Sequence, residues 1–197
     1  MKPVGLTAYK ITFNSFSIAF VSFGLLLGTA LLAAETTMDL GLYRTIYTIW
    51  ATVVLVTPAL CAFILPGNSA AKQNTWILFW TFSFLCYLVH MAYALLVVYQ
   101  ASFEEFLKGQ GVFPAIVNVI FTIWWAVDVF LAWFYARESR WVTAQRVAAH
   151  IFIGLTFFAS AVILKHGFIN VLGVLMTICV LICLMMRLDA ARKQIHP

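Results

Sequence analysis

The stretch at residues 168–187, FINVLGVLMTICVLICLMMR, contains a single charged side chain, and that charge stands at its last position. A run of about 20 apolar residues is long enough to cross the hydrocarbon core of a bilayer as a helix. Lipid offers no hydrogen-bond partner to the backbone, so a spanning segment must be a helix or part of a closed barrel. Barrel strands show short alternating polarity, which this stretch lacks. It therefore predicts a transmembrane helix.

Five further stretches of the chain have the same apolar character. Their approximate ranges are 11–34, 44–65, 76–99, 113–135 and 146–164. Charges, glycines and prolines fill the segments between them, and the segment with Glu104, Glu105 and Lys108 is expected to be a loop. The shortest connection, residues 165–167, predicts an antiparallel hairpin. The chain is thus predicted to be one all-α domain, residues 1–197, in which six transmembrane helices with short loops form a bundle.

Composition agrees with this class of protein. Of the 197 residues, 64% are hydrophobic and 10% are charged, whereas a soluble domain is about 45–50% apolar and about 25% charged. These values exclude a disordered chain, a secreted disulfide scaffold and a DNA-binding domain, so no nucleic-acid partner is expected. The cysteines all lie inside predicted helices, at Cys61, Cys86, Cys179 and Cys183.

The basic residues are distributed unevenly between the two ends of the predicted bundle. One side of the predicted membrane carries only Arg44, at the start of the second span, and Lys108 and Lys165 in the loops after the third and fifth spans. The other nine of the 12 Lys and Arg residues lie on the opposite side, at Lys2, Lys10, Lys72, Arg137, Arg140, Arg146, Arg187, Arg192 and Lys193. Cytoplasmic loops carry an excess of Lys and Arg, so both termini are predicted to be cytoplasmic. The expected location is a cell membrane of the bacterial inner-membrane type, with the first span retained as a signal anchor.

Asp128 is the acidic residue that lies well inside a predicted span. A charge at such a depth is costly and is normally paired, neutral or next to water. Counting residues back from the loop between the fourth and fifth spans places His150 within about one turn of Asp128 across an antiparallel pair. Two interpretations stay open for this pair. It relays protons or handles ions, since imidazole exchanges protons near neutral pH, or it forms a structural hydrogen bond that sets the helix register.

A second group of polar and aromatic residues lies in the outer half of the predicted bundle, around the histidine nearest to a span centre. These candidate ligand-binding residues are His90, Tyr87, Tyr93, Trp124, Asn118 and Asn170. The sequence contains neither the HExxH pattern of zinc proteases nor the GxSxG pattern of serine hydrolases. No catalytic residue and no metal ligand is therefore predicted. Whether the chain is an enzyme stays open, although the absence of these motifs favours a non-enzymatic protein.

Gly24 and Gly28 form a small-xxx-small step in the first predicted span. Such steps let two helix backbones approach closely in lipid. They are therefore the expected helix-packing positions of this span.

Three functions are compatible with these patterns. The first is a non-catalytic binding or complex-forming subunit that contacts lipid, an apolar ligand, partner helices or a second copy of itself; short loops and an aromatic content of 16% favour it. The second is a small-solute or proton-coupled transporter, or a substrate-binding membrane component, that uses Asp128 and His90. The third is a haem- or quinone-binding redox anchor. A haem held by His90 and His150 together is excluded, because their depths differ by about 15 Å. Apart from that third alternative, no cofactor is predicted.

Overall fold

The computed structural model describes residues 10–135 and 139–195. No strand occurs within these ranges, and six helices are long and apolar enough to cross a membrane. The predicted all-α bundle of six spans is therefore confirmed. Lys2 and Arg137, two of the cations behind the predicted topology, lie outside the described residues.

Two of the six spans end in a short π-helical segment. The elements are α1 (Phe13–Ala34), α2 (Leu40–Ile64), α3 (Ala70–Tyr93) continued by η1 (Ala94–Val98), α4 (Phe103–Gln110), α5 (Val112–Phe134), α6 (Arg140–Phe158) continued by η2 (Ala159–Leu164), and α7 (Phe168–Ile195). The tight connection between η2 and α7 matches the predicted hairpin.

Three helices begin four to six residues before the expected positions, at residues 40, 70 and 140 rather than 44, 76 and 146. Each start is set by a capping side chain that accepts a backbone N–H: Asp39 from Leu42, Ser69 from Lys72, and Ser139 from Val142. Caps satisfy the first amides of a helix whatever the hydropathy of the turn that follows. Hydropathy alone therefore placed these starts too late.

The loop expected around Glu104, Glu105 and Lys108 is instead the short helix α4, which corrects the prediction. Ser102 caps this helix by accepting the Glu105 N–H. The acids in its first turn and Lys108 in its last turn complement the helix dipole. Phe106 is buried against the Tyr99 ring, with ring centroids 5.4 Å apart. Hydropathy does not predict this helix, because the helix is short and strongly amphipathic.

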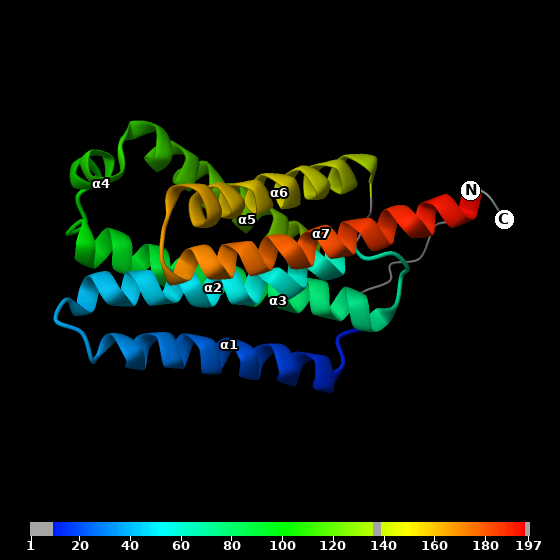
Figure 1. Cartoon of the computed structure of the whole chain (residues 1–197), viewed down its shortest axis with the longest axis horizontal. Helices are drawn as coiled ribbons and strands as arrows, with labels where there is room; N and C mark the ends of the chain where they lie inside the picture. The colour runs from blue at the N-terminus through cyan, green and yellow to red at the C-terminus, as the bar shows by residue number, and fades with distance from the viewer. Residues whose placement is uncertain (1–9, 136–138, 196–197) are drawn as a thin grey trace.

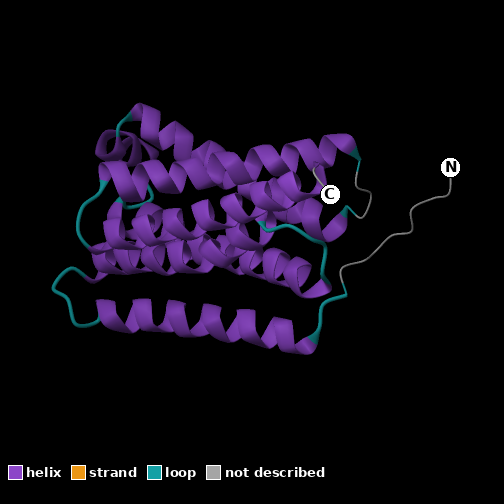
Figure 2. Cartoon of the chain, turned by 45° about the vertical axis from the view of Figure 1, so that its right-hand side comes forward, coloured by secondary structure: helices purple, strands orange, loops and turns teal. Residues whose placement is uncertain are grey.

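The two ends of the bundle are easily told apart (Figures 1 and 2). The start of α1 and the end of α7 lie at one end, together with the α2–α3 connection, the end of α5 and the start of α6; we call this the terminal end. The α1–α2 and η2–α7 connections lie at the other end, with α4. Of the most apolar window in each span, 50% is buried for α2, but 11% for α1 and 17% for α7. The core is thus built around α2, while α1 and α7 stand at its edges.

Helix α1 packs on α2 and α3 through small side chains, since Ala19, Ala30 and Ala34 are all buried. Gly24 and Gly28 take no part in this packing, because a Cβ atom at either position would meet nothing within 4 Å. The close helix approach expected at these glycines therefore does not occur within the described chain. Contact between this step and another chain stays a prediction.

Candidate functional site

Asp128 lies on α5 and is fully buried, with 0% of its surface exposed. The indole N–H of Trp80, on α3, donates a hydrogen bond of 2.9 Å to its Oδ2. The other carboxyl oxygen, Oδ1, has no hydrogen-bond partner with good geometry among the described residues, although Gln145 lies beside it. Trp80 thus donates a hydrogen bond to one carboxyl oxygen of Asp128, which has no access to solvent.

The hydrogen bonds of His150, on α6, determine which ring nitrogen carries its proton. The indole N–H of Trp76 lies 2.8 Å from Nε2. Indole can only donate, so Nε2 accepts and carries no proton. Nδ1 lies 2.8 Å from the Arg146 carbonyl oxygen, to which it donates. The geometry therefore specifies a neutral imidazole with its proton on Nδ1.

Aromatic rings enclose the two faces of this imidazole. Phe63 of α2 and Trp80 of α3 each stack on it with ring centroids 3.9 Å apart, at interplanar angles of 19° and 12°. Three helices besides α6 thus meet around His150: α2, α3 and, through Asp128, α5. Because both faces and both nitrogens are in contact with protein, the ring has one well-determined orientation.

The structure brings Asp128 and His150 side by side. Oδ2 of the acid and Nδ1 of the imidazole are 3.8 Å apart, which is too long for a hydrogen bond. Each group is instead bonded to a different partner, the Trp80 indole for the acid and the Arg146 carbonyl for the imidazole. Whether this pair relays protons stays a prediction.

Arg146 connects the buried pair to the terminal end of the bundle. Its guanidinium carbon lies 4.8 Å from the centre of a Trp76 ring, and its charge is near enough to act on Asp128. Arg146 and Trp76 also line a cavity of about 180 Å³, whose other lining residues are Ala62, Phe63, Asn68, Lys72 and Gln73. We call Asp128, His150, Trp76, Trp80 and Arg146 the polar cluster.

The outer-half candidates are brought together only in part. His90 Nδ1 lies 2.8 Å from the Thr45 carbonyl oxygen, and the neighbouring Tyr87 hydroxyl is 3.0 Å from Thr122 Oγ1. The Tyr87 and His90 rings are 5.8 Å apart, and the Tyr93 ring lies 5.5 Å from the Arg44 guanidinium. These three candidates follow one another along α3.

The other three outer-half candidates make separate contacts. The Asn118 amide donates to Gln110 Oε1 at 2.5 Å, and Trp124 stacks on Phe152 at 5.2 Å. The Asn170 amide donates to the Val162 carbonyl of η2 at 2.8 Å. None of the six candidates lines the 180 Å³ cavity. Their roles in binding a ligand, and a haem or quinone in this half, stay predictions.

Sequence reasoning missed Trp76, Trp80 and Arg146 as partners of the buried pair. One signal was present: Trp76 and Trp80 are four residues apart, so their indoles lie on one face of α3. A buried acid and a buried histidine need donors, and tryptophan offers one inside an apolar span. Within residues 10–135 and 139–195, no three His, Cys, Asp or Glu side chains gather as a metal site requires.

Comparison with known proteins found no matching family model, no matching curated protein and no matching solved structure.

Proposed function

We propose that the chain is a non-catalytic integral membrane protein that works by binding lipid, an apolar ligand or the helices of partner chains. The observation that carries this proposal is the outward orientation of α1 and α7, of whose apolar windows only 11% and 17% are buried. Phe13, Phe16 and Phe20 are all exposed on α1. Beside them, a Cβ atom at Gly24 or Gly28 would meet nothing within 4 Å among the described residues, and the step has the spacing that allows close helix association.

The polar cluster supports the same proposal through its structural role. Its hydrogen bonds and stacking contacts join α2, α3, α5 and α6, and they use both nitrogens of His150 and one oxygen of Asp128. Buried hydrogen bonds between helices restrict how those helices can pack against one another. A bundle held in this way presents its outer helices in a constant geometry, as a binding surface requires.

The assembly can be tested by extracting the full chain with its native lipids and measuring the particle mass. We expect a particle that contains more protein than one 22.1 kDa chain, or one that retains bound lipid or apolar ligand. Gly24→Leu should reduce the assembly without unfolding the chain, because the added side chain meets open space. Leu32→Phe, at another exposed position of α1, is the control. A single chain that retains nothing contradicts the proposal.

The proposal includes a cell-membrane location with both termini in the cytoplasm. Nine of the 12 basic residues support this orientation, and the start of α1 and the end of α7 share one end of the bundle (Figure 1). Reporter fusions to the two termini and to the η2–α7 connection test it. The termini should report cytoplasm and the connection the opposite side.

A second candidate function is proton-coupled transport of a small solute, and one observation favours it. Asp128 Oδ1 has no hydrogen-bond partner with good geometry among the described residues, and Arg146, whose charge acts on this acid, also lines the 180 Å³ cavity. In sealed vesicles, Asp128→Asn should then abolish solute-driven proton flux, tested with a panel of amino acids, sugars and vitamins. Asp189→Asn, which removes an exposed acid paired with Lys193, is the control. Equal flux in both variants removes Asp128 from the mechanism.

A further inference from the structure

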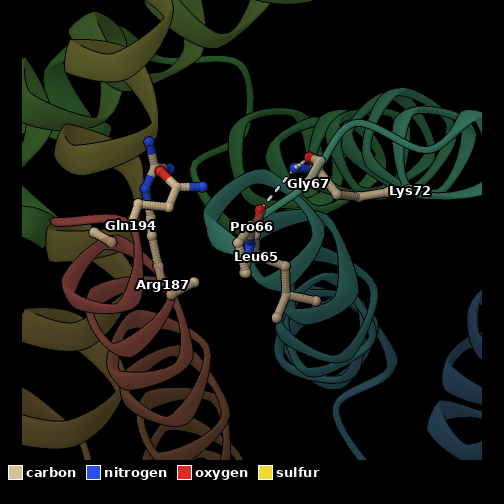
Figure 3. A pocket seen from close by; sticks show the side chains of 8 residues that line it. Leu65, Pro66, Gly67, Lys72, Arg187 and Gln194 are labelled. Atoms are coloured by element: carbon tan, nitrogen blue, oxygen red, sulfur yellow. Dashed lines mark hydrogen bonds between the residues drawn. The ribbon is translucent and has the colours of Figure 1, made fainter. Parts of the chain in front are cut away.

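A second cavity, of about 270 Å³, lies at the terminal end between the α2–α3 turn and the last turns of α7 (Figure 3). The turn contributes Leu65, Pro66 and Gly67, and α3 contributes Lys72. Arg187 and Gln194 face them from α7, together with two alanines. One part of the lining is therefore apolar, and the other part carries two cations and an amide.

Backbone carbonyls hold the two cations in place. The Lys72 ammonium donates to the carbonyl oxygens of Leu65 and Gly67, at 2.6 and 2.5 Å. An ammonium has three donors, so one remains for a ligand. Arg187 Nη1 donates to the Ile64 carbonyl at 3.3 Å, which leaves most of the guanidinium donors available. Carbonyl groups orient these side chains without neutralising them.

Within residues 10–135 and 139–195, no carboxylate compensates the positive charge of this cavity. Arg187 is near enough to Lys72 for the two charges to repel, and no acidic residue of the described chain lines the cavity. The nearby Asp189 pairs with Lys193 at 2.7 Å. Among the described residues, no carboxylate forms an ion pair with Lys72 or Arg187. An anion placed between the two cations would relieve their repulsion.

We propose that this cavity binds a phosphate group between Lys72 and Arg187. Guanidinium matches phosphate through paired hydrogen bonds, and ammonium adds a compact charge. The group has two possible sources, a phospholipid headgroup or a soluble phosphate. The apolar walls formed by Leu65, Pro66 and the alanines suit the glycerol and first methylenes of a lipid. A lipid headgroup in this cavity would rest on the lipid-binding form of the proposed function, since α7 lines the cavity. Arg187→Gln separates the two proposals, because it changes the cavity and leaves the exposed face of α1 with its Gly24–Gly28 step intact.

The test uses the purified full chain with two probes, inorganic phosphate and nanodiscs that contain phosphatidylglycerol in phosphatidylcholine. Lipid retention is counted by native mass spectrometry, and phosphate binding is measured by calorimetry. Arg187→Gln and Lys72→Gln remove one cation each. Arg192→Gln is the matched control, because it removes an exposed cation of α7 that does not line the cavity. Arg187→Gln should weaken binding by about tenfold more than the control, as expected for the loss of a charge-assisted hydrogen bond.

The outcomes distinguish a lipid headgroup from a soluble phosphate, and a specific site from general attraction to basic residues. Retention of phosphatidylglycerol without binding of inorganic phosphate assigns the cavity to a lipid headgroup, and binding of free phosphate that weakens in Arg187→Gln assigns it to a soluble ligand. Equal losses in Arg187→Gln and Arg192→Gln would show only general attraction to the basic surface and would overturn the proposal. Failure of the wild type to bind either probe would overturn it as well. Since Arg187 is exposed, its substitution tests the site even if Lys72→Gln disturbs the turn.

Discussion

Trp80→Phe should weaken the bundle by removing the hydrogen bond that reaches the Asp128 carboxyl group. Phenylalanine keeps an aromatic ring at this position but has no N–H. The substitution leaves Asp128, with 0% of its surface exposed, without the 2.9 Å bond from Trp80. Its Oδ1 already has no partner among the described residues. A buried polar group that loses its partner carries its full desolvation cost.

Trp125→Phe is the matched control for this experiment. Trp125 also has 0% of its surface exposed, and its ring lies 5.0 Å from that of Trp80. Its indole N–H has no hydrogen-bond partner among the residues that the structure describes. Both substitutions remove the same atoms from buried positions, so most of the lost packing is common to them. The difference between them contains the hydrogen bond to Asp128 and any change in the stacking of Trp80 on His150, and removing Asp128 separates these two contributions.

The expected difference follows from the kind of bond. Hydrogen bonds to charged groups contribute about 1.5–3 kcal/mol, whereas hydrogen bonds between membrane helices average about 0.6 and reach about 1.7 kcal/mol. Trp80→Phe should therefore lower the free energy of unfolding by about 1–3 kcal/mol more than Trp125→Phe.

The measurement is reversible unfolding in mixed micelles, followed by helical circular dichroism. The same comparison in an Asp128→Leu background should show no difference, because the acceptor is gone. Losses that agree within about 0.5 kcal/mol in the native background would refute the reasoning, as would a difference that persists without Asp128.

Three further predictions concern other contacts. Gly173→Ala should lower the free energy of unfolding by about 1–3 kcal/mol, because its Cβ atom would lie 2.7 Å from a side chain of η2. Gly154→Ala is the control and should not destabilise the chain, since the nearest neighbour of its Cβ atom is 4.0 Å away. Unfolding titrations compare the two variants. Asn170→Ala should cost about 1–2 kcal/mol in the same assay, since its amide bonds a carbonyl of η2 at 2.8 Å. Nitrogen-15 NMR should find the His150 proton on Nδ1, and Trp76→Phe should leave it there, because the Arg146 carbonyl oxygen can only accept a hydrogen bond.

Hydropathy predicted the spans because lipid imposes a simple rule on any chain that crosses it. A stretch such as residues 168–187 cannot leave its amides unpaired in hydrocarbon, so its composition is enough to predict a helix. The rule does not apply in water, where the errors lie. Helix α4 and the starts of α2, α3 and α6 depend on the capping side chains Asp39, Ser69, Ser102 and Ser139.

The sequence predicts how deep the residues of the candidate site lie in the bundle, but not which way each helix is rotated about its axis. A short connection between α5 and α6 sets Asp128 and His150 at similar depth, and counting residues is enough to find this. Which side chains face the pair depends on the rotation of each helix about its axis, which depth does not specify. Trp76 and Trp80 were therefore missed, and Asn118, Trp124 and Asn170 were grouped by depth although their contacts differ.

The tautomer of His150 restricts any proton relay through the polar cluster. A proton leaving Asp128 cannot be accepted by Nδ1, which faces the acid at 3.8 Å but already carries a proton bound to the Arg146 carbonyl. The nitrogen able to accept one, Nε2, is occupied by the Trp76 indole. A relay would thus have to break the Trp76 bond before the imidazole could be protonated. Trp76→Phe removes that obstacle, so it should raise proton flux if the pair works as a relay. If the pair is structural, the substitution should only reduce stability.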